Sequence, residues 1–448
     1  MRKVFRDPIH NLISFDKNEE KLIIDLINTK EMQRLRRIKQ LGLSFVTYCG
    51  TDHSRFSHSL GVAYLAKRVV EALSHFEDDS DSKEFIKELK DKENQLLLIA
   101  AALLHDIGHG PFSHALERFT GKKHEKWTIA ILGEETTAVN KILKKQHGTE
   151  FIKRLQNIIL RTDKSILVKI ISSQLDVDRF DYLLRDSLMA GVEYGKYDLE
   201  WILHSLRIRK VKKEAEIVLD ISKGKHAAEG YILARYWMYT QVYYHKTTRG
   251  AEVLLDKILT RASDILTDGG DIPCHPIVAQ ILKKESVPVS DYLELDDVVL
   301  LYLFKEWAYS SDAILSDLCR RFLNRELLKS IDITETLGAT AKKVSLLISK
   351  ANERGFSDKY YIESDVAENS AYKDYYLQPK NTNQESPIND NDEEEATEQI
   401  FILQKGGSLD EFSNKSEIIK TLRNKTFALE RLYFPEELKE EVRSLGLL

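Results

Sequence analysis

The stretch 96-LLLIAAALLHDIGHGPFSH-114 organises the rest of the chain. It opens with an apolar run of helical length, which predicts a buried helix because the run leaves no polar face for water. His105 and Asp106 follow directly, and turn-forming glycines and a proline bring His109 and His114 back toward the same place. Polar groups this dense beside a core need partners, so we interpret the cluster as a metal site with acid and base groups rather than as one satisfied core histidine.

The composition is that of an ordinary globular protein. Of the 448 residues, 42% are hydrophobic and 31% are charged, and the formal net charge of −5 gives no overall basic field for nucleic acid. No apolar stretch is long enough to span a bilayer, and the N-terminus lacks the pattern of a signal peptide. Cys49, Cys274 and Cys319 are scattered, which fits neither a disulfide framework nor a paired-cysteine zinc site. We therefore expect a cytoplasmic protein without membrane contact.

Helical periodicity dominates the chain, with a few interruptions. Thr29 is expected to cap a helix within 18–41, and alternation at 207–221 predicts a β-hairpin. Residues 353–380 are expected to be irregular, and the acidic segment 381–399 has too few apolar side chains to pack, which predicts a mobile loop. Further helices are expected from Ser57 onward and over 124–160, 226–270 and 288–350, and helix and strand signals return at 400–403 and 414–435.

Seven motifs follow one another in the first 255 residues: DPIH, TKEMQRLRRIKQLG, RFSHSLGV, HDIGHGPFSH, a His-Glu dipeptide, DVDRFDYLLRD and YYHKTTR. In this order they resemble the HD-domain superfamily of metal-dependent phosphohydrolases. Within it, the chain is similar to the deoxynucleoside triphosphate (dNTP) triphosphohydrolases, which include bacterial dNTPases and the catalytic part of the vertebrate SAM-and-HD-domain protein. The resemblance implies a mainly α fold, with an HD-type helical bundle, a small β-hairpin and a mixed α/β C-terminal region.

The resemblance also suggests a division of the chain. Residues 1–255 would form the catalytic core with an N-terminal nucleotide and interface segment. Residues 256–448 would form a helical and irregular C-terminal region that includes the acidic loop.

The family's H…HD…D pattern implies one or two divalent metal ions. On this sequence the ligands would be His58, His105, Asp106 and Asp178. Asp178 is assigned because the second Asp of the DVD motif is the ligand in the family. Two imidazoles and two carboxylates suit Mn, Mg, Fe, Ni or Zn, and the spacing does not choose among them.

The implied reaction is attack of an activated water on the α-phosphorus, which releases inorganic triphosphate and a deoxynucleoside. The acid/base and phosphate-contacting residues would be His114, Glu117, His124 and His109, and relatives commonly carry Asp at the position of Glu117. Tyr182 would fill the space of a ribose 2′-hydroxyl and so favour deoxy sugars. The full set of implied substrate-binding residues is Arg55, Gln40, Leu41, Arg179, Tyr182, Asp186, Arg235, Tyr243 and Lys246.

Many members of the family are tetramers switched on by nucleotides bound between subunits. The resemblance therefore implies a homo-oligomer, a tetramer or a dimer of dimers. Asn28 stands where the vertebrate relative has an Asp that reads guanine, and an amide lacks the acceptor-only carboxylate that guanine donors need. We hence expect an altered effector preference. The implied effector-binding residues are Lys3, Val4, Asn28, Gln33 and Arg36.

Two alternative hypotheses about the function stay open at this point. The bare metal motif also fits another HD phosphohydrolase, such as a nucleotidase, a cyclic-nucleotide phosphodiesterase or a (p)ppGpp hydrolase. The fold could instead serve a non-catalytic nucleotide sensor or nucleic-acid-binding module, although the intact ligand set and the negative net charge argue against this reading. Nucleic-acid binding is possible but not indicated.

Overall fold

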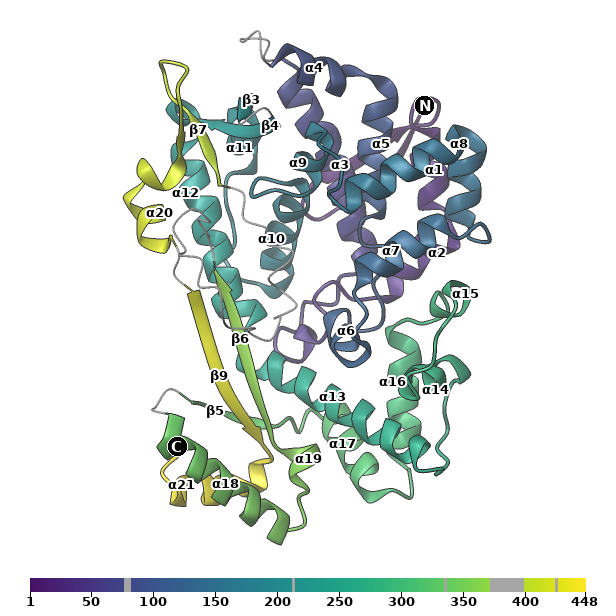
Figure 1. Ribbon diagram of the computed structural model, residues 1–448, viewed down its shortest axis with the longest axis vertical. Coiled ribbons are helices and arrows are strands. Elements are labelled where there is room, and N and C mark those ends of the chain that lie inside the picture. Colours follow the sequence, from purple (N-terminus) through teal and green to yellow (C-terminus); the bar gives the residue numbers. More distant parts are fainter. Residues whose placement is uncertain (76–81, 212–213, 334–336, 371–398, 424–425) are drawn as a thin grey trace.

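The computed structural model describes residues 1–75, 82–211, 214–333, 337–370, 399–423 and 426–448. Figure 1 shows a helical bundle in the upper part of the molecule and a second group of helices below it. A sheet with two long strands runs along one side between the two groups. Helices dominate, as the sequence predicts.

Helix α5 (Lys92–Leu104) is the centre of the bundle. Its residues 97–104 are all buried, which confirms the prediction from the apolar run. Asp91 caps its N-terminus by accepting a hydrogen bond from the backbone N–H of Asn94. The helices around it are α1 (Lys21–Ile27), α2 (Lys30–Arg34), α3 (Arg55–Ser74), α4 (Lys83–Lys90), α7 (His124–Gly133), α8 (Ala138–Ile159), α9 (Ile166–Ile171) and α10 (Val177–Ala190).

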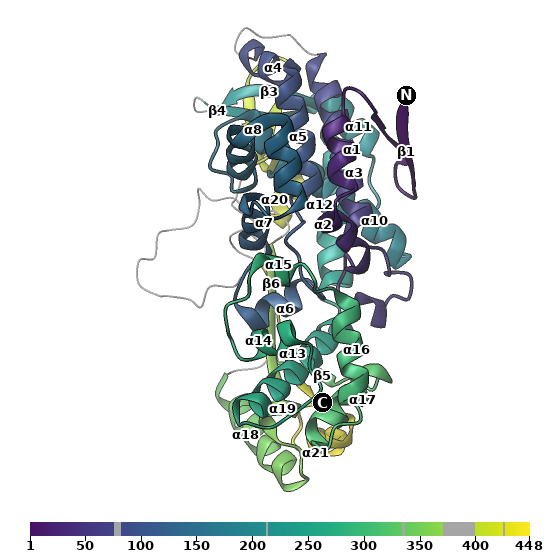
Figure 2. The ribbon, with the colours of Figure 1, turned by 90° about the vertical axis from the view of Figure 1, so that its right-hand side faces the viewer.

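The chain begins with an antiparallel hairpin that packs on this bundle. Strands β1 (Arg2–Asp7) and β2 (Asn11–Asp16) pair from Arg2 with Asp16 to Asp7 with Asn11. Strand β2 buries Ile13 and Phe15 in the bundle core, whereas β1 lies on the outside (Figure 2). Behind the hairpin, Thr29 caps α2 by accepting a hydrogen bond from the N–H of Met32, as predicted.

A small sheet packs against the bundle next to α9. The predicted hairpin is present as β3 (Leu206–Val211) and β4 (Glu214–Asp220). Strand β7 (Phe401–Leu403) returns from the C-terminal part and pairs in parallel with β4, and β8 (Leu409–Glu411) completes the order β3-β4-β7-β8. The neighbouring helices are α11 (Leu199–Ser205), α12 (Ile221–Met238) and α20 (Glu417–Leu422).

The lower group of helices has a hydrophobic core of its own. That core also takes in Leu43, Phe112 and Trp127 from the first part of the chain, so the turn after the HD dipeptide is packed between the two cores. Phe112 is buried against Phe304 and Phe322. The helices are α6 (His114–Thr120), α13 (Lys246–Thr267), α14 (Pro276–Leu282), α15 (Val289–Tyr292), α16 (Asp297–Trp307), α17 (Ala313–Leu323) and α19 (Asp358–Tyr361).

The long strands belong to a second sheet with the order β5-β9-β6. The expectation of irregular structure over 353–380 is wrong for residues 363–370. They form β6 (Glu363–Ser370), which pairs with β9 (Thr426–Phe434) along its whole length. Strand β5 (Lys329–Asp332) lies on the other side of β9, and α18 (Leu337–Glu353) and α21 (Lys439–Ser444) pack at its end. The acidic segment 381–399 lies, except for its last residue, outside the described residues.

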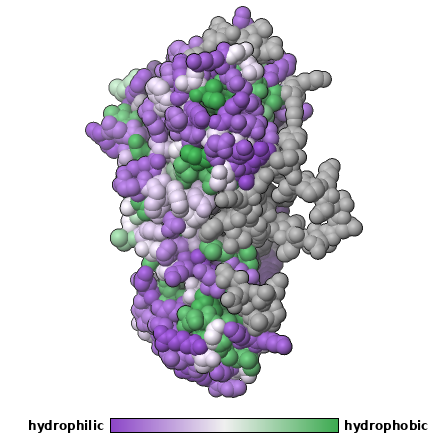
Figure 3. Space-filling view, turned by 90° about the vertical axis from the view of Figure 1, so that its left-hand side faces the viewer, coloured by the Kyte–Doolittle hydropathy of each residue, from purple (hydrophilic) through white to green (hydrophobic). Residues whose placement is uncertain are grey.

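Among the residues that the structure describes, no helix is both long enough and apolar enough to cross a bilayer. On the face shown in Figure 3, hydrophobic residues form separate patches among hydrophilic ones.

Candidate metal centre and active site

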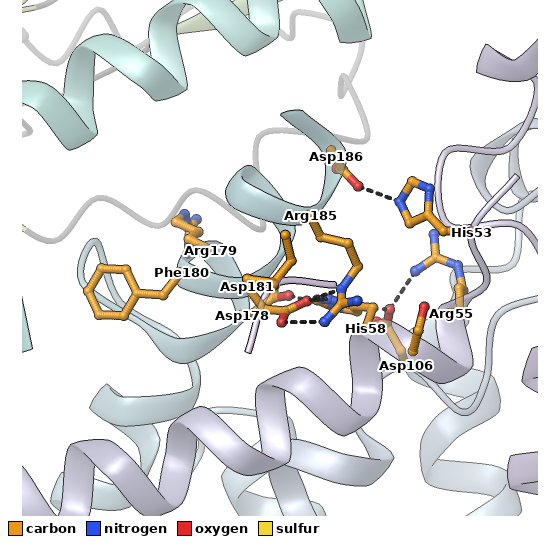
Figure 4. Close-up of polar contacts among 12 residues, drawn as sticks. His53, Arg55, His58, Asp106, Asp178, Arg179, Phe180, Asp181, Arg185 and Asp186 are labelled. Atoms are coloured by element: carbon orange, nitrogen blue, oxygen red, sulfur yellow. Dashed lines mark hydrogen bonds and ion pairs between the residues drawn. The ribbon is translucent and has the colours of Figure 1, made fainter. Parts of the chain in front are cut away.

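Three helices bring the four implied metal ligands together. His58 lies in the first turn of α3, His105 and Asp106 follow the end of α5, and Asp178 lies in the first turn of α10. His58 Nε2 is 3.0 Å from Asp178 Oδ1 and 3.8 Å from Asp106 Oδ2. His105 Nε2 is 3.5 Å from Asp178 Oδ1 and 3.3 Å from Asp106 Oδ1. Figure 4 shows His58, Asp106 and Asp178 converging.

The two imidazoles are oriented by hydrogen bonds on their far side. His58 Nδ1 lies 2.9 Å from Asp181 Oδ2, and His105 Nδ1 lies 2.9 Å from the carbonyl oxygen of Ala102. Each ring therefore directs Nε2 toward the carboxylates, and Nε2 of His105 is buried with no hydrogen-bond partner among the described residues. Such second contacts fix ring orientation in metal sites.

The donor set fits a divalent metal. Bonds of about 2.1 Å place adjacent ligand atoms about 3.0–3.4 Å apart, and the four distances above span 3.0–3.8 Å. Burial lowers the pKa of His58, but its bonds to Asp178 and Asp181 outweigh this and raise the pKa to about 10. A site that holds a proton between imidazole and carboxylate in this way is suited to hold a cation in its place.

The two aspartates of the DVD motif have different partners. Asp176 caps α10 by accepting a hydrogen bond from the backbone N–H of Arg179 at 2.7 Å, and it also forms an ion pair with the Arg179 guanidinium. Asp178, two residues later, faces His58 and His105. This arrangement supports Asp178 as the ligand.

A second cluster lies next to the ligands. The rings of His109 and His124 are stacked with centroids 3.7 Å apart, and Glu117 Oε1 is 3.3 Å from His109 Nδ1 and 3.0 Å from His124 Nδ1. His109 Nε2 is 3.4 Å from Asp106 Oδ1, so the cluster reaches the metal ligands and its donor atoms are themselves candidates for a cation. Burial, with the charge of Arg55, lowers the pKa of His109 to about 4, which leaves its ring neutral near pH 7. His114 begins α6, but its side chain lies outside the described part of the structure.

Arg55 ties α3 to the turn that follows His109. Its Nη1 donates to Asp106 Oδ2 at 2.5 Å and its Nε donates to Ser113 Oγ at 2.9 Å. Phe112 and Ser113 have φ values of 51° and 53°, in the left-handed region that side chains other than glycine rarely adopt. This backbone conformation persists only where its surroundings hold it.

Asp297 helps to hold Phe112 in this backbone conformation. Its role was not predicted from the sequence. Its Oδ1 accepts a hydrogen bond from the backbone N–H of Phe112 at 2.8 Å, and its Oδ2 accepts one from the N–H of Lys39 at 2.9 Å. The sequence signal, an acidic pair before the apolar residues of α16, indicates only a helix start. The contacts of Asp297 with Phe112 and Lys39 could therefore not be predicted from the local sequence.

The residues implied for the sugar are connected through Asp186 and His53. Asp186 Oδ1 is 2.8 Å from His53 Nε2, and Asp186 Oδ2 accepts a hydrogen bond from the Tyr243 hydroxyl at 2.9 Å. The rings of Tyr182 and Tyr243 meet edge to face with centroids 6.2 Å apart. Gln40 is joined to His53 through the backbone, and Leu41, next to it, is half-buried. His53, which was not predicted from the sequence, thus joins Gln40 to Asp186.

The cations implied for the triphosphate have different surroundings. Arg235 is buried and its Nη1 donates to Gln174 Oε1 at 2.6 Å, whereas Lys246 is exposed at the start of α13. Burial raises the pKa of Tyr182, and the charges of Arg179 and Arg235 oppose that rise.

The implied effector residues fall into two groups. Asn28, Gln33 and Arg36 lie at the corner between α1 and α2, where Arg36 Nε donates to Gln33 Oε1 at 2.8 Å and Gln33 Nε2 donates to the carbonyl oxygen of Ile27 at 2.7 Å. Lys3 and Val4 are exposed on β1. Asn28 and Arg36 are exposed like Lys3 and Val4, whereas Gln33 is half-buried.

Comparisons with known proteins agree with this geometry. Family models of the HD domain and of the HD-associated region match residues 55–186 and 198–272. YwfO, an uncharacterized protein of Bacillus subtilis, is 40% identical over 440 residues, covering 97% of this chain and 93% of that protein. Human deoxynucleoside triphosphate triphosphohydrolase SAMHD1 is 30% identical over 366 residues, covering 74% of this chain and 53% of that protein. The crystal structure of a phosphohydrolase from Bacteroides thetaiotaomicron is similar with a TM-score of 0.78, at 28% identity, covering 97% of this chain and all of that one.

Proposed function

The chain belongs to the HD-domain family of phosphohydrolases, and from that premise we propose that it converts dNTP and water into a deoxynucleoside and inorganic triphosphate. The observation that carries this proposal is the convergence of His58, His105, Asp106 and Asp178 beside the Glu117–His109–His124 cluster. The similarity to SAMHD1 supports dNTPs as the substrate class.

The four ligands would hold a divalent metal, which supplies Lewis-acid stabilisation of the α-phosphate and a water of lowered pKa. The water oxygen bonds to the α-phosphorus and gives up a proton to the solvent, the bond from phosphorus to O5′ breaks, and O5′ takes up a proton. We assign that proton to His114. Glu117, which contacts both imidazoles, would hold His109 and His124 in place, and Arg55, which is paired with Asp106 and Ser113, would contact a phosphate oxygen.

Deoxy sugars would be selected by a wall of aromatic and hydrogen-bonded side chains. Tyr243 and His53 both hold Asp186, and Tyr182 packs against Tyr243. A rigid wall of this kind would leave no room for a ribose 2′-hydroxyl, and a hydroxyl forced against the aromatic rings would be buried without a hydrogen-bond partner. Arg179, Arg235 and Lys246 would hold the triphosphate together with Arg55.

We further propose a homo-oligomer, a tetramer or dimer of dimers, with a nucleotide effector between subunits. The outward-facing corner of Asn28, Gln33 and Arg36 and the exposed Lys3 and Val4 of β1 would contribute to that site from different chains. Because Asn28 replaces a carboxylate, GTP should not be the sole activator. The unpaired state of Cys49, Cys274 and Cys319 supports a reducing compartment, the cytoplasm.

Product analysis tests the proposal. Each of the four dNTPs is incubated with the purified protein and Mn²⁺ or Mg²⁺, alone, in pairs and with GTP. Release of deoxynucleoside and triphosphate that disappears in Asp106→Ala would support it. Metal binding without triphosphate release in any mixture would refute it and point to another phosphoester substrate.

A further inference from the structure

We propose that the N-terminal hairpin is a working part of the metal centre, because its turn positions Asp181 and thereby His58. Docking of the hairpin and binding of the metal would then reinforce each other. The inference rests on the metal-dependent activity proposed above, but it concerns residues outside the ligand set.

The Asp181 carboxylate is shared by three side chains. Its Oδ2 is 2.9 Å from His58 Nδ1, and its Oδ1 is 2.7 Å from Nε2 of His10 in the hairpin turn. Arg185, one turn later on α10, donates to both oxygens, from Nε at 2.7 Å and from Nη2 at 2.9 Å. All four side chains are at most 2% exposed. Figure 4 shows Asp181 and Arg185 beside His58.

The hairpin turn is held at both of its ends, at His10 by Asp181 and at Asp7 by Arg185. Arg185 Nη1 donates to Asp7 Oδ2 at 2.8 Å, and Asp7 Oδ1 accepts hydrogen bonds from the backbone N–H groups of Ile9 and His10, each at 2.9 Å. Asp7 thus shapes the turn that presents His10, and Arg185 joins Asp7 to Asp181. Loss of the turn would remove the hydrogen bond from His10 to Asp181. It would also free Arg185 from Asp7 and so weaken its hold on Asp181.

The backbone of α3 leaves room for this network at one position. A Cβ atom placed on Gly61 would lie 1.9 Å from Asp181 Oδ1 and 2.5 Å from Arg185 Nη2. Gly61 is one turn after His58, so the carboxylate is pressed against the same helix that carries the ligand. The carboxylate therefore has little freedom to move without moving His58.

Removing a partner that orients a ligating imidazole typically weakens metal affinity 10–100-fold. The same linkage requires that the metal, by fixing His58, stabilise the docked hairpin. Lys3 and Val4 on strand β1 are both exposed, so a ligand that binds them and steadies the hairpin would tighten metal binding by the same route.

The test uses Mn²⁺ alone as the probe, without nucleotide. Isothermal titration calorimetry on the full chain should show the Kd for Mn²⁺ rising about tenfold or more in His10→Ala. His10→Gln, which keeps an N–H donor near the position of Nε2, should recover most of the affinity. His226→Ala, an exposed histidine on α12, is the matched control and should bind Mn²⁺ like the wild type.

Hydrogen exchange on the wild-type protein tests the linkage without any variant. Mn²⁺ should slow amide exchange across residues 2–16, and the slowing should be lost in His58→Ala. Each of three results would overturn the inference. They are a Kd for Mn²⁺ that is unchanged in His10→Ala, amide exchange in the hairpin that is the same with and without Mn²⁺, and no binding of Mn²⁺ by the wild type. Coupling between Mn²⁺ and the hairpin without dNTP hydrolysis would refute only the proposed substrate.

Discussion

Replacing Asp297 with alanine should damage activity far more than stability. The carboxylate holds the N–H groups of Phe112 and Lys39, and Phe112 begins the left-handed pair that shapes the turn after His109. Without it, that pair is free to relax toward ordinary backbone angles, because each such residue costs on the order of 1–3 kcal/mol to hold. The side chains that follow on α6 would then shift.

The effect on stability comes from two opposing contributions. Two backbone donors lose their acceptor, at about 1–3 kcal/mol each. Burial raises the pKa of Asp297 from 3.8 to about 6 despite these two hydrogen bonds, so removing the carboxylate recovers about 3 kcal/mol at pH 7, which is the net cost of ionising it in the folded protein. The net loss is therefore at most about 3 kcal/mol. A misplacement of about 1 Å in a catalytic group costs on the order of 100-fold in kcat.

The assay compares triphosphate release under metal saturation with urea unfolding of the same preparations. Glu294→Ala, an exposed carboxylate shortly before α16, is the matched control and should match the wild type in both measurements. Activity of Asp297→Ala within threefold of the wild type would refute the reasoning. So would a loss of activity explained by an unfolded fraction of the protein.

Two more predictions follow from buried groups near the site. Because the folded state holds a proton on Asp297 up to about pH 6 whereas the unfolded chain loses it near 3.8, the unfolding free energy of the wild type relative to Asp297→Asn should fall by up to about 3 kcal/mol as pH rises from 4 to 7. A difference that stays constant across that range, measured by urea unfolding, would contradict the assignment. Gly61→Ala should destabilise the protein by about 1–3 kcal/mol or more, because its Cβ overlaps Asp181. Gly230→Ala, in a helix with open space around it, should be neutral or stabilising by thermal unfolding, and equal effects of the two substitutions would argue against the packed network.

Local patterns were enough to predict the elements whose structure is decided locally. The apolar run before His105 forms a buried helix, Thr29 caps α2, and the alternating residues near 207–221 form a hairpin. The pairing of β6 with β9 was missed because its partner lies beyond a long acidic stretch, and nothing within 363–370 specifies a strand by itself.

In the candidate site, too, locally determined features could be predicted and long-range contacts could not. The implied ligands could be placed from their motifs, but the residues that orient them act across the fold: His10, Asp181 and Asp297 each contact partners more than a hundred residues away. Asp181 did carry a signal, since it stands three residues after Asp178 and thus near the same face of a helix. The sequence could not show whether that face meets a metal ligand or solvent.

Hydrolysis in water enriched in ¹⁸O tests the central claim most directly. The protein is incubated with Mn²⁺ and a dNTP mixture. The products are separated, and their masses are measured by mass spectrometry. Attack of water on the α-phosphorus predicts one ¹⁸O in the inorganic triphosphate, none in the deoxynucleoside, and no product in Asp178→Ala. Appearance of ¹⁸O in the deoxynucleoside, or formation of deoxynucleoside monophosphate and diphosphate, would contradict the account.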